Sequence, residues 1–322
     1  MTDTSESTTP GQRPDIDPIL KMVLDAVPLE FTIADGVDVA REKFRAVKPP
    51  PEMLPDLRIE ARVIGHGDLT DVPVRIYWPP VDQHADLPVV IFFHGGGWCI
   101  GDLDTHDHVA RAHAIGAEAI VVSVDYRLAP EHPFPAGVDD AWAALQWVAE
   151  HAGELGGDPT RIAVAGDSAG GNLSAVMALR ARDAGGPPLV FQLLWYPVAV
   201  GDLSAPSFTE NADAPILAVD AVAEFSRWYA KGQDLRNPPA TLVPGRATDF
   251  ANLAPAYIAV AGHDPLRDDG IRYGELLSAA DVPVEVHNAE TLVHGYLGYA
   301  GVVPAATDAV ERGLSALRRA LA

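Results

Sequence analysis

The amino-acid sequence predicts an α/β fold with a mostly parallel, eight-stranded sheet and helices on both faces. Two observations lead to this prediction. From residue 89 onward, short apolar runs alternate with stretches rich in helix-forming residues, and strands that alternate with helices form parallel sheets covered on both sides. In addition, residues 89–93 are apolar at every position, as expected for a strand buried on both faces.

The elements follow in order along the chain. Apolar residues at helical spacing over 17–44 predict two helices with a break near 28–34, and the three prolines at 49–51 predict a boundary. Turn residues at 65–68 separate two alternating runs, which predicts an antiparallel pair at one edge of the sheet. The predicted strands cover 58–64, 72–78, 89–93, 119–124, 161–165, 189–195, 256–260 and 284–286. The predicted helices of the alternating region cover 105–117, 138–151, 169–182, 269–280 and 305–321.

The alternation is interrupted between about residues 200 and 249. This stretch is too long for an ordinary connection, and it carries Phe225, Trp228 and Tyr229 on a predicted helix. We therefore expect an insertion that lies over the edge of the sheet.

The composition excludes several classes of function. The 322 residues include 23 Lys and Arg against 45 Asp and Glu, a formal net charge of −22, which argues against nucleic acid or an anionic membrane as a partner. Cys99 is the single cysteine, so neither an intramolecular disulfide nor a multi-cysteine metal site is expected. The polar, acidic N-terminus lacks a signal-peptide pattern, and no apolar run is long enough to span a membrane. These features predict a cytoplasmic protein.

The residues 166–170 fit the pattern Gly-x-Ser-x-Gly of a nucleophile elbow. An apolar run precedes them and a run of helix formers follows. Strand, tight turn and helix would place the hydroxyl of Ser168 at a sharp corner above the sheet, near the positive end of a helix dipole. Ser168 is therefore the candidate nucleophile.

A serine nucleophile needs a base and a group that orients the base. Both should follow later strands, because the carboxyl ends of parallel strands form the reactive edge. Asp264 follows the strand at 256–260, and His294 follows the strand at 284–286 after a short loop. The chain order Ser, Asp, His is that of α/β-hydrolases. The alternatives are Asp268 or Asp269 as the acid and His263 or His287 as the base.

A second signal directly follows the strand at 89–93, where His94, three glycines and Trp98 stand in a row. Glycines allow backbone N–H groups to turn toward a ligand, and such groups hold the oxyanion in acyl transfer. We expect Gly96, Gly97 and Ala169 to donate, while His94 and Gly95 shape the loop. A nucleotide P-loop is the alternative, but no Lys-Ser/Thr pair follows.

Five blocks, taken together, resemble the hormone-sensitive-lipase family of α/β-hydrolases, in its bacterial esterase branch related to arylacetamide deacetylase. The blocks are 94–98, 125–136, 166–172, 264–268 and 294–296, and the resemblance covers roughly residues 50–300. One departure is Tyr296, where the family more often has phenylalanine.

The resemblance implies hydrolysis of carboxylic esters without a cofactor. We expect short- to medium-chain esters as substrates and no metal. The resemblance also implies a catalytic domain over 51–199 and 250–322, covered by a helical cap made of residues 1–50 and the insertion 200–249. The candidate walls of a substrate pocket are Trp98, Phe208, Leu217, Phe225 and Trp228, with core packing as the alternative for each.

Three other functions remain open at this point. An amidase or deacetylase would use the same triad, and a lipase would act at lipid interfaces. A non-catalytic binder, such as the related gibberellin receptors, is disfavoured because His294 is present. Members of the family often pair through their last strand, so the partners expected are a small-molecule ester and a second copy in a homodimer.

Overall fold

The computed structural model describes residues 13–27, 36–49, 53–65, 71–81 and 86–322. These residues form one sheet of eight strands in the order β1-β2-β4-β3-β5-β6-β7-β8. β1 pairs with β2 and β2 with β4 in antiparallel fashion, and all the other pairs are parallel. The predicted α/β fold, with an antiparallel pair at one edge, is therefore confirmed.

The bounds of the elements agree with the predicted ones to within a few residues, apart from the two strands described below. The strands are β1 (Ile59–Ile64), β2 (Val72–Tyr77), β3 (Leu87–Phe93), β4 (Ile120–Val124), β5 (Gly157–Asp167), β6 (Phe191–Trp195), β7 (Ala256–His263) and β8 (Val284–Val293). The helices are α1 (Pro18–Ala26), α2 (Val37–Ala46), α3 (Asp107–Ala117), α4 (Ala136–His151), α5 (Ala169–Ala184), α6 (Pro206–Glu210), α7 (Val219–Tyr229), α8 (Arg267–Ala279) and α9 (Pro304–Leu321).

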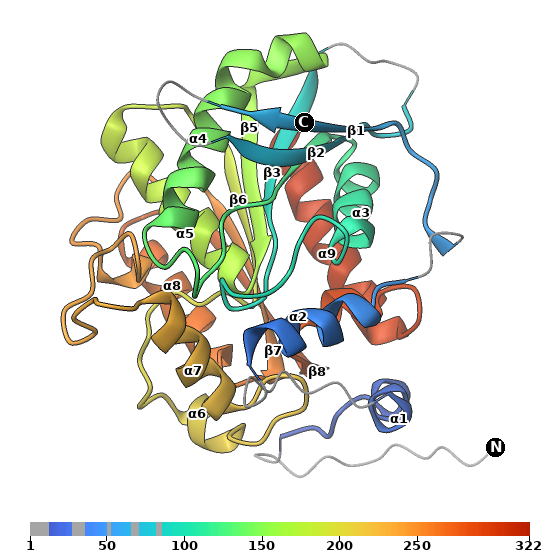
Figure 1. Cartoon of the computed structure of the whole chain (residues 1–322), viewed down its shortest axis with the longest axis vertical. Helices are drawn as coiled ribbons and strands as arrows, with labels where there is room; N and C mark the ends of the chain where they lie inside the picture. The colour runs from blue at the N-terminus through green and yellow to red at the C-terminus, as the bar shows by residue number, and fades with distance from the viewer. Residues whose placement is uncertain (1–12, 28–35, 50–52, 66–70, 82–85) are drawn as a thin grey trace.

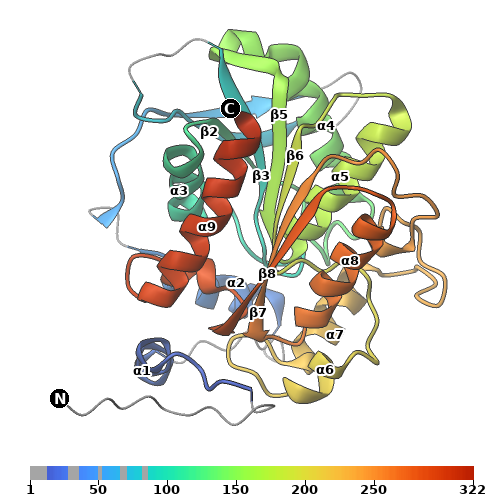
Figure 2. The same ribbon diagram turned by 180° about the vertical axis from the view of Figure 1, so that it is seen from behind.

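The helices cover the two faces of the sheet. α4, α5 and α8 lie on one face, and α3 and α9 lie on the other, as the two opposite views show (Figures 1 and 2). Successive residues of β3 serve both faces: Ile91 and Phe93 pack toward α4 and α5, whereas Val90 and Phe92 pack toward α3 and α9. This is why the strand is apolar throughout.

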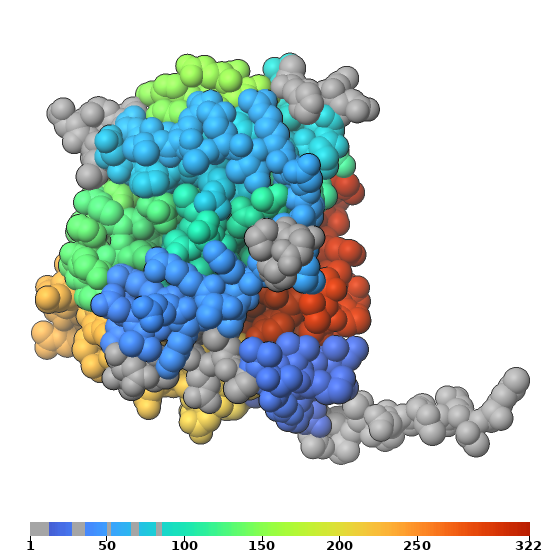
Figure 3. All heavy atoms as spheres, turned by 45° about the vertical axis from the view of Figure 1, so that its right-hand side comes forward, coloured from blue at the N-terminus to red at the C-terminus, as the bar shows by residue number. Residues whose placement is uncertain are grey.

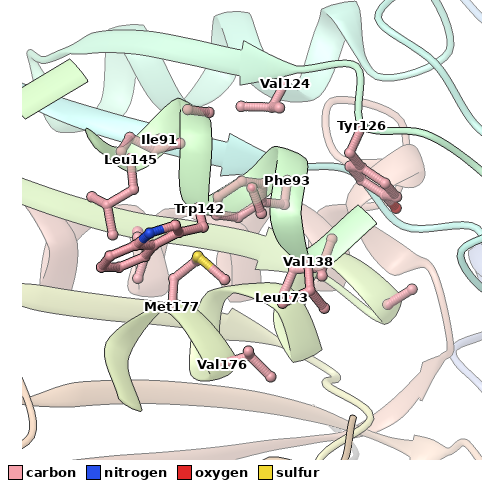
Figure 4. Packing of buried hydrophobic residues seen from close by; sticks show 14 of the residues in the cluster. Ile91, Phe93, Val124, Tyr126, Val138, Trp142, Leu145, Leu173, Val176 and Met177 are labelled. Carbon is pink, nitrogen blue, oxygen red and sulfur yellow. The ribbon is translucent and has the colours of Figure 1, made fainter. Parts of the chain in front are cut away.

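The core between the sheet and α4–α5 is closely filled. Trp142 and Leu145 of α4 and Met177 of α5 point toward Ile91 of β3 (Figure 4). Burial of such side chains stabilises the fold by about 1.5–3 kcal/mol each. This packing fixes the positions of the carboxyl ends of the parallel strands.

Among the described residues, four helices lie outside these two layers. α1, α2, α6 and α7 gather at the end of the molecule where the parallel strands finish (Figure 1). Leu20 and Leu24 of α1 pack in the same cluster as Leu297 and Val303, and α1 lies beside this C-terminal segment on the surface (Figure 3). Residues from both the start of the chain and the insertion thus reach the reactive edge of the sheet.

Two strands differ from the predicted bounds. β5 extends over Gly157–Asp167 and β8 over Val284–Val293, whereas the sequence predicted 161–165 and 284–286. His294 consequently follows β8 directly, so the predicted short loop before it was wrong. His287 lies inside β8 rather than near its end. The apolar residues of the sequence did not indicate the full length of β8, because β8 is an edge strand with several half-exposed polar residues.

The predicted break near 28–34 lies outside the described residues, as do most of the proline boundary at 49–51 and of the turn at 65–68. In the part of the chain that the structure describes, no helix is both long enough and apolar enough to cross a bilayer.

Candidate active site

Ser168 lies in the sharp turn between β5 and α5. Its backbone has φ +54° and ψ −115°, a conformation that non-glycine residues rarely adopt. The Ser168 N–H donates to the carbonyl of Trp195 at 2.8 Å and so ties the turn to the end of β6. A Cβ atom on Gly170 would lie 1.8 Å from the carbonyl oxygen of Phe93, so glycine is required for α5 to approach β3 this closely.

The three predicted catalytic side chains lie together at the ends of β5, β7 and β8. Ser168 Oγ lies 3.0 Å from His294 Nε2, and His294 Nδ1 lies 2.7 Å from Asp264 Oδ2. The other carboxylate oxygen of Asp264 accepts the Leu266 N–H at 2.8 Å. Because a carboxylate only accepts, Nδ1 carries the proton, which leaves Nε2 free to accept from the serine hydroxyl.

The rival acids lie elsewhere. Asp268 accepts the Ser207 N–H at 2.8 Å and pairs with Arg267. Asp269 is buried and accepts the backbone N–H groups of residues 199–201. Both stand in the first turn of α8, where an acid is favourable for local reasons. The structure therefore brings only Asp264 among the three to the imidazole.

The rival bases are also occupied elsewhere. His263 Nε2 donates to the carbonyl of Pro14 at 3.0 Å, and His287 pairs within the ladder opposite Ala259 of β7. Burial and nearby arginines lower the pKa of both histidines. Neither contacts Ser168 in the part of the chain that the structure describes.

The glycine loop after β3 adopts conformations that favour glycine. Gly96 and Gly97 have φ of +115° and +56°, and both line the same cavity as Ser168. The Gly95 N–H instead donates to Asp167 Oδ1 at 2.9 Å, which leaves it unable to bind a ligand. Ala169 is the first residue of α5, so its N–H precedes the intrahelical bonds and is free of them.

His94 anchors the start of this loop. Its ring stacks on Tyr126 with centroids 4.4 Å apart, and the Tyr126 hydroxyl donates to the His94 carbonyl at 2.7 Å. His94 Nδ1 donates to the Gly95 carbonyl at 2.8 Å. Burial and the nearby His106 lower the pKa of His94 to about 4, so the ring is neutral near pH 7.

Two residues of the site escaped the sequence analysis. Asp167 is buried, bonds the glycine loop through Gly95, and lies 3.5 Å from His106 Nε2. Burial disfavours the ionised form of Asp167, but His106, His94 and the Gly95 N–H outweigh it and lower the pKa of Asp167. Tyr196 has φ +35° and lies against His294. The sequence feature that could have identified Asp167 and Tyr196 is their position, because each stands at the carboxyl end of a predicted strand.

A cavity of about 340 Å³ opens above Ser168 and His294. Of the five predicted wall residues, Trp98, Leu217 and Phe225 line it, while Phe208 and Trp228 are not among its lining residues. Phe208 is buried and Trp228 half-buried in the large cluster around α4 and α5. Further apolar walls come from several elements and include Val23 of α1, Phe44 of α2, Ile216 and Leu266. Apolar side chains thus dominate the cavity.

Comparison with known proteins agrees with this geometry. A family model described as the alpha/beta hydrolase fold matches residues 90–298, which is more than half of the chain. The chain belongs to the α/β-hydrolase family.

Individual relatives are similar along nearly their whole length. Carboxylesterase NlhH of Mycobacterium tuberculosis is 66% identical over 312 residues, which cover 96% of this chain and 97% of that protein. Esterase LipI of the same organism is 63% identical over 315 residues and covers 98% of each chain. The crystal structure of DphMB1 superposes with a TM-score of 0.91 at 64% identity, covering 96% of this chain and 100% of that chain. The resemblance to the esterase branch of the hormone-sensitive-lipase family is confirmed.

Proposed function

We propose that the protein is a serine carboxylesterase that hydrolyses short- to medium-chain esters through an acyl-enzyme intermediate. The observation that carries this proposal is the chain of hydrogen bonds from Ser168 Oγ to His294 Nε2 and from His294 Nδ1 to Asp264 Oδ2, at 3.0 and 2.7 Å. The relatives named above are a carboxylesterase and an esterase, which supports the same activity.

The reaction proceeds in two halves. Ser168 Oγ attacks the ester carbonyl while His294 Nε2 takes its proton, and Asp264 holds the imidazole and stabilises the imidazolium. His294 then protonates the leaving alcohol. Water, activated by the same imidazole, attacks the acyl-enzyme and releases the acid.

The oxyanion of each tetrahedral intermediate lies between the glycine loop and the start of α5. Gly96, Gly97 and Ala169 donate their N–H groups to it, and the positive end of the α5 dipole adds to the stabilisation. His94, Gly95 and Asp167 hold the loop in place through the contacts described above. One such donor contributes about 2.7–4 kcal/mol to the transition state in a comparable enzyme.

The cavity selects neutral, apolar esters. Trp98, Leu217 and Phe225 form its walls around the acyl or alcohol group, and an ionised group packed against these three side chains would lose its hydration without a polar partner among them. The described parts of residues 1–50, together with residues 200–249, act as a cap over the catalytic domain formed by 51–199 and 250–322, because α1, α2 and α7 supply walls of the cavity. Small-molecule esters, rather than nucleic acid or a membrane, are the partners of this site.

The homodimer and the cytoplasmic location stay predictions. β8 is an edge of the sheet, with Val286 39% exposed, and an edge strand can pair with a second copy. The mass of the protein in solution, measured by light scattering, distinguishes monomer from dimer.

The proposed activity is tested with p-nitrophenyl esters from acetate to laurate. We expect a burst of p-nitrophenol with acetate and a preference for the shorter chains. Ser168→Ala should lower kcat by about 10⁴-fold or more at an unchanged melting temperature. Substantial turnover by Ser168→Ala overturns the proposal, and faster hydrolysis of matched p-nitroanilides assigns the site to an amidase instead.

A further inference from the structure

Asn211 links the N-terminal segment to the backbone of the catalytic acid. It follows α6 directly and is 3% exposed. Its Nδ2 donates to the Asp264 carbonyl at 3.1 Å, and its Oδ1 accepts from Arg13 Nη2 at 2.7 Å. Because a guanidinium only donates and a carbonyl only accepts, the amide has one orientation that satisfies both partners.

The N-terminal segment is bound to the same region at two further points. The Pro14 carbonyl accepts from His263 Nε2 at 3.0 Å, one residue before the acid. The Asp17 N–H donates to the Thr291 carbonyl at 2.9 Å, in the strand that leads to the base. The segment therefore joins the ends of β7 and β8, the two strands that carry Asp264 and His294.

α6 contacts the residues after the acid. Ser207 Oγ donates to the Pro265 carbonyl at 2.7 Å, and the Ser207 N–H donates to Asp268 Oδ2 at 2.8 Å. Arg267 Nη1 lies 2.7 Å from Glu210 Oε2. These contacts hold the turn at 264–268 from outside the sheet, and Asn211 holds it at the acid itself.

We propose that Asn211 is a positioning residue for the catalytic acid and that Arg13 keeps its amide in the required orientation. Asn211 touches no reacting atom, so it acts through the place of the Asp264 backbone, from which the carboxylate reaches His294 Nδ1 at 2.7 Å. Small displacements in a triad are costly, since a misplacement of about 1 Å can reduce the rate about 10²-fold. The inference rests on the proposed esterase function and assigns a residue of the insertion and one of the N-terminal segment to that same site.

The first test is Asn211→Asp, which changes one atom of the side chain. It places an oxygen opposite the Asp264 carbonyl oxygen and keeps an acceptor for Arg13. We expect kcat for p-nitrophenyl butyrate to fall about 10-fold to 100-fold, with KM within about twofold. Asn237→Asp is the matched control, because Asn237 is exposed and the same charge is introduced; it should retain wild-type kcat. An unchanged kcat in Asn211→Asp overturns the proposal.

A double-mutant cycle separates positioning from general structural damage. In an Asp264→Ala background no acid remains to be positioned, so adding Asn211→Asp should leave the residual rate unchanged. An equal loss in both backgrounds refutes the proposed role. This outcome differs from failure of the esterase function itself, which would appear as substantial turnover by Ser168→Ala.

Arg13 supplies an independent test if Asn211→Asp does not fold. Arg13→Gln leaves Asn211 in place and removes its charged donor; we expect kcat to fall about 3-fold to 10-fold at constant KM. Arg13→Lys, which can still donate to Asn211 Oδ1, should restore at least part of the loss. Arg236→Gln is the control at a side chain that is 92% exposed. Wild-type kcat in Arg13→Gln contradicts the proposal.

Discussion

The aromatic ring of Tyr196 lies against the imidazole of His294, with ring centroids 4.7 Å apart and planes inclined by 57°. Tyr196 is 1% exposed and stands directly after β6 in a left-handed backbone conformation, with φ +35°. The imidazole is therefore held by the hydrogen bond from its Nδ1 to Asp264 and by its contact with the tilted ring of Tyr196, which restricts the positions that its Nε2 can take above Ser168.

Replacement of this ring should slow catalysis. Tyr196→Leu keeps an apolar side chain but removes the planar surface, so we expect kcat to fall about 10-fold with a smaller change in KM. Tyr196→Phe keeps the ring and should stay within about threefold of the wild type. Steady-state kinetics with p-nitrophenyl acetate measure both, and equal rates for the leucine and phenylalanine variants would contradict the role of the ring.

Phe225 forms a wall of the cavity next to the glycine loop. Its ring is so close to the glycine loop that a Cβ atom on Gly97 would lie 2.4 Å from it, and it lines the cavity above Ser168. Phe225→Ala should enlarge the cavity and shift the preferred acyl chain toward longer esters. Trp228→Ala, three residues along the same helix but outside the lining, is the control and should keep the wild-type profile. A p-nitrophenyl ester series measures the shift, and the same profile for all three proteins would disprove the assignment.

Stability should decrease as the pH falls from 6.5 toward 4. Burial lowers the pKa of His94, His108 and His113 from 6.5 to about 4, so in this window the unfolded chain binds more protons than the folded one. The stabilisation is fully present above pH 6.5 and is lost as the pH drops. Asp125 acts in the opposite direction, because burial raises its pKa from 3.8 to about 6.

For these four groups the net effect is at most two protons, or about 3 kcal/mol per pH unit; His263 and His287, whose pKa values burial also lowers, act in the same direction as the other histidines. Urea unfolding at pH 7, 6, 5 and 4.5 measures it. A free energy of unfolding that stays constant over this range would show that these histidines are protonated in the folded protein.

Gly170→Ala should prevent folding or destabilise the protein by about 3 kcal/mol or more. The new Cβ atom would lie 1.8 Å from the Phe93 carbonyl oxygen, and both partners are backbone held in regular elements. Gly153→Ala is the matched control, since no atom lies within 4 Å of its Cβ position; it should change the free energy of unfolding by less than about 1 kcal/mol. Thermal unfolding of both variants decides the matter, and a melting temperature near that of the wild type for Gly170→Ala would refute the close approach.

The sequence predicted the sheet and the triad because both depend on local signals. Ser168, Asp264 and His294 each follow an apolar strand at the same edge, and this placement can be inferred from chain order alone. The length of β8 could not be inferred, because polar residues such as Asn288 and Glu290 interrupt the apolar pattern by which a strand is predicted. An edge strand tolerates such residues. The faces of α7 were equally ambiguous: Phe225 and Trp228 are both aromatic, and only packing decides which one meets the cavity. Asn211 carries no local signal, since its role depends on residues 198 positions apart in the chain.

The direct passage of β8 into His294 ties the catalytic base to a ladder of backbone hydrogen bonds with β7. An insertion or deletion of one residue within Val284–Val293 would turn every following side chain to the opposite face, and the imidazole would leave the site. Changes of length during divergence are therefore tolerated only outside this strand. Evolution of new substrate ranges is channelled into the cavity walls supplied by the segments before residue 50 and between 200 and 249, provided that Arg13 and Asn211 keep their contacts with the backbone of the acid.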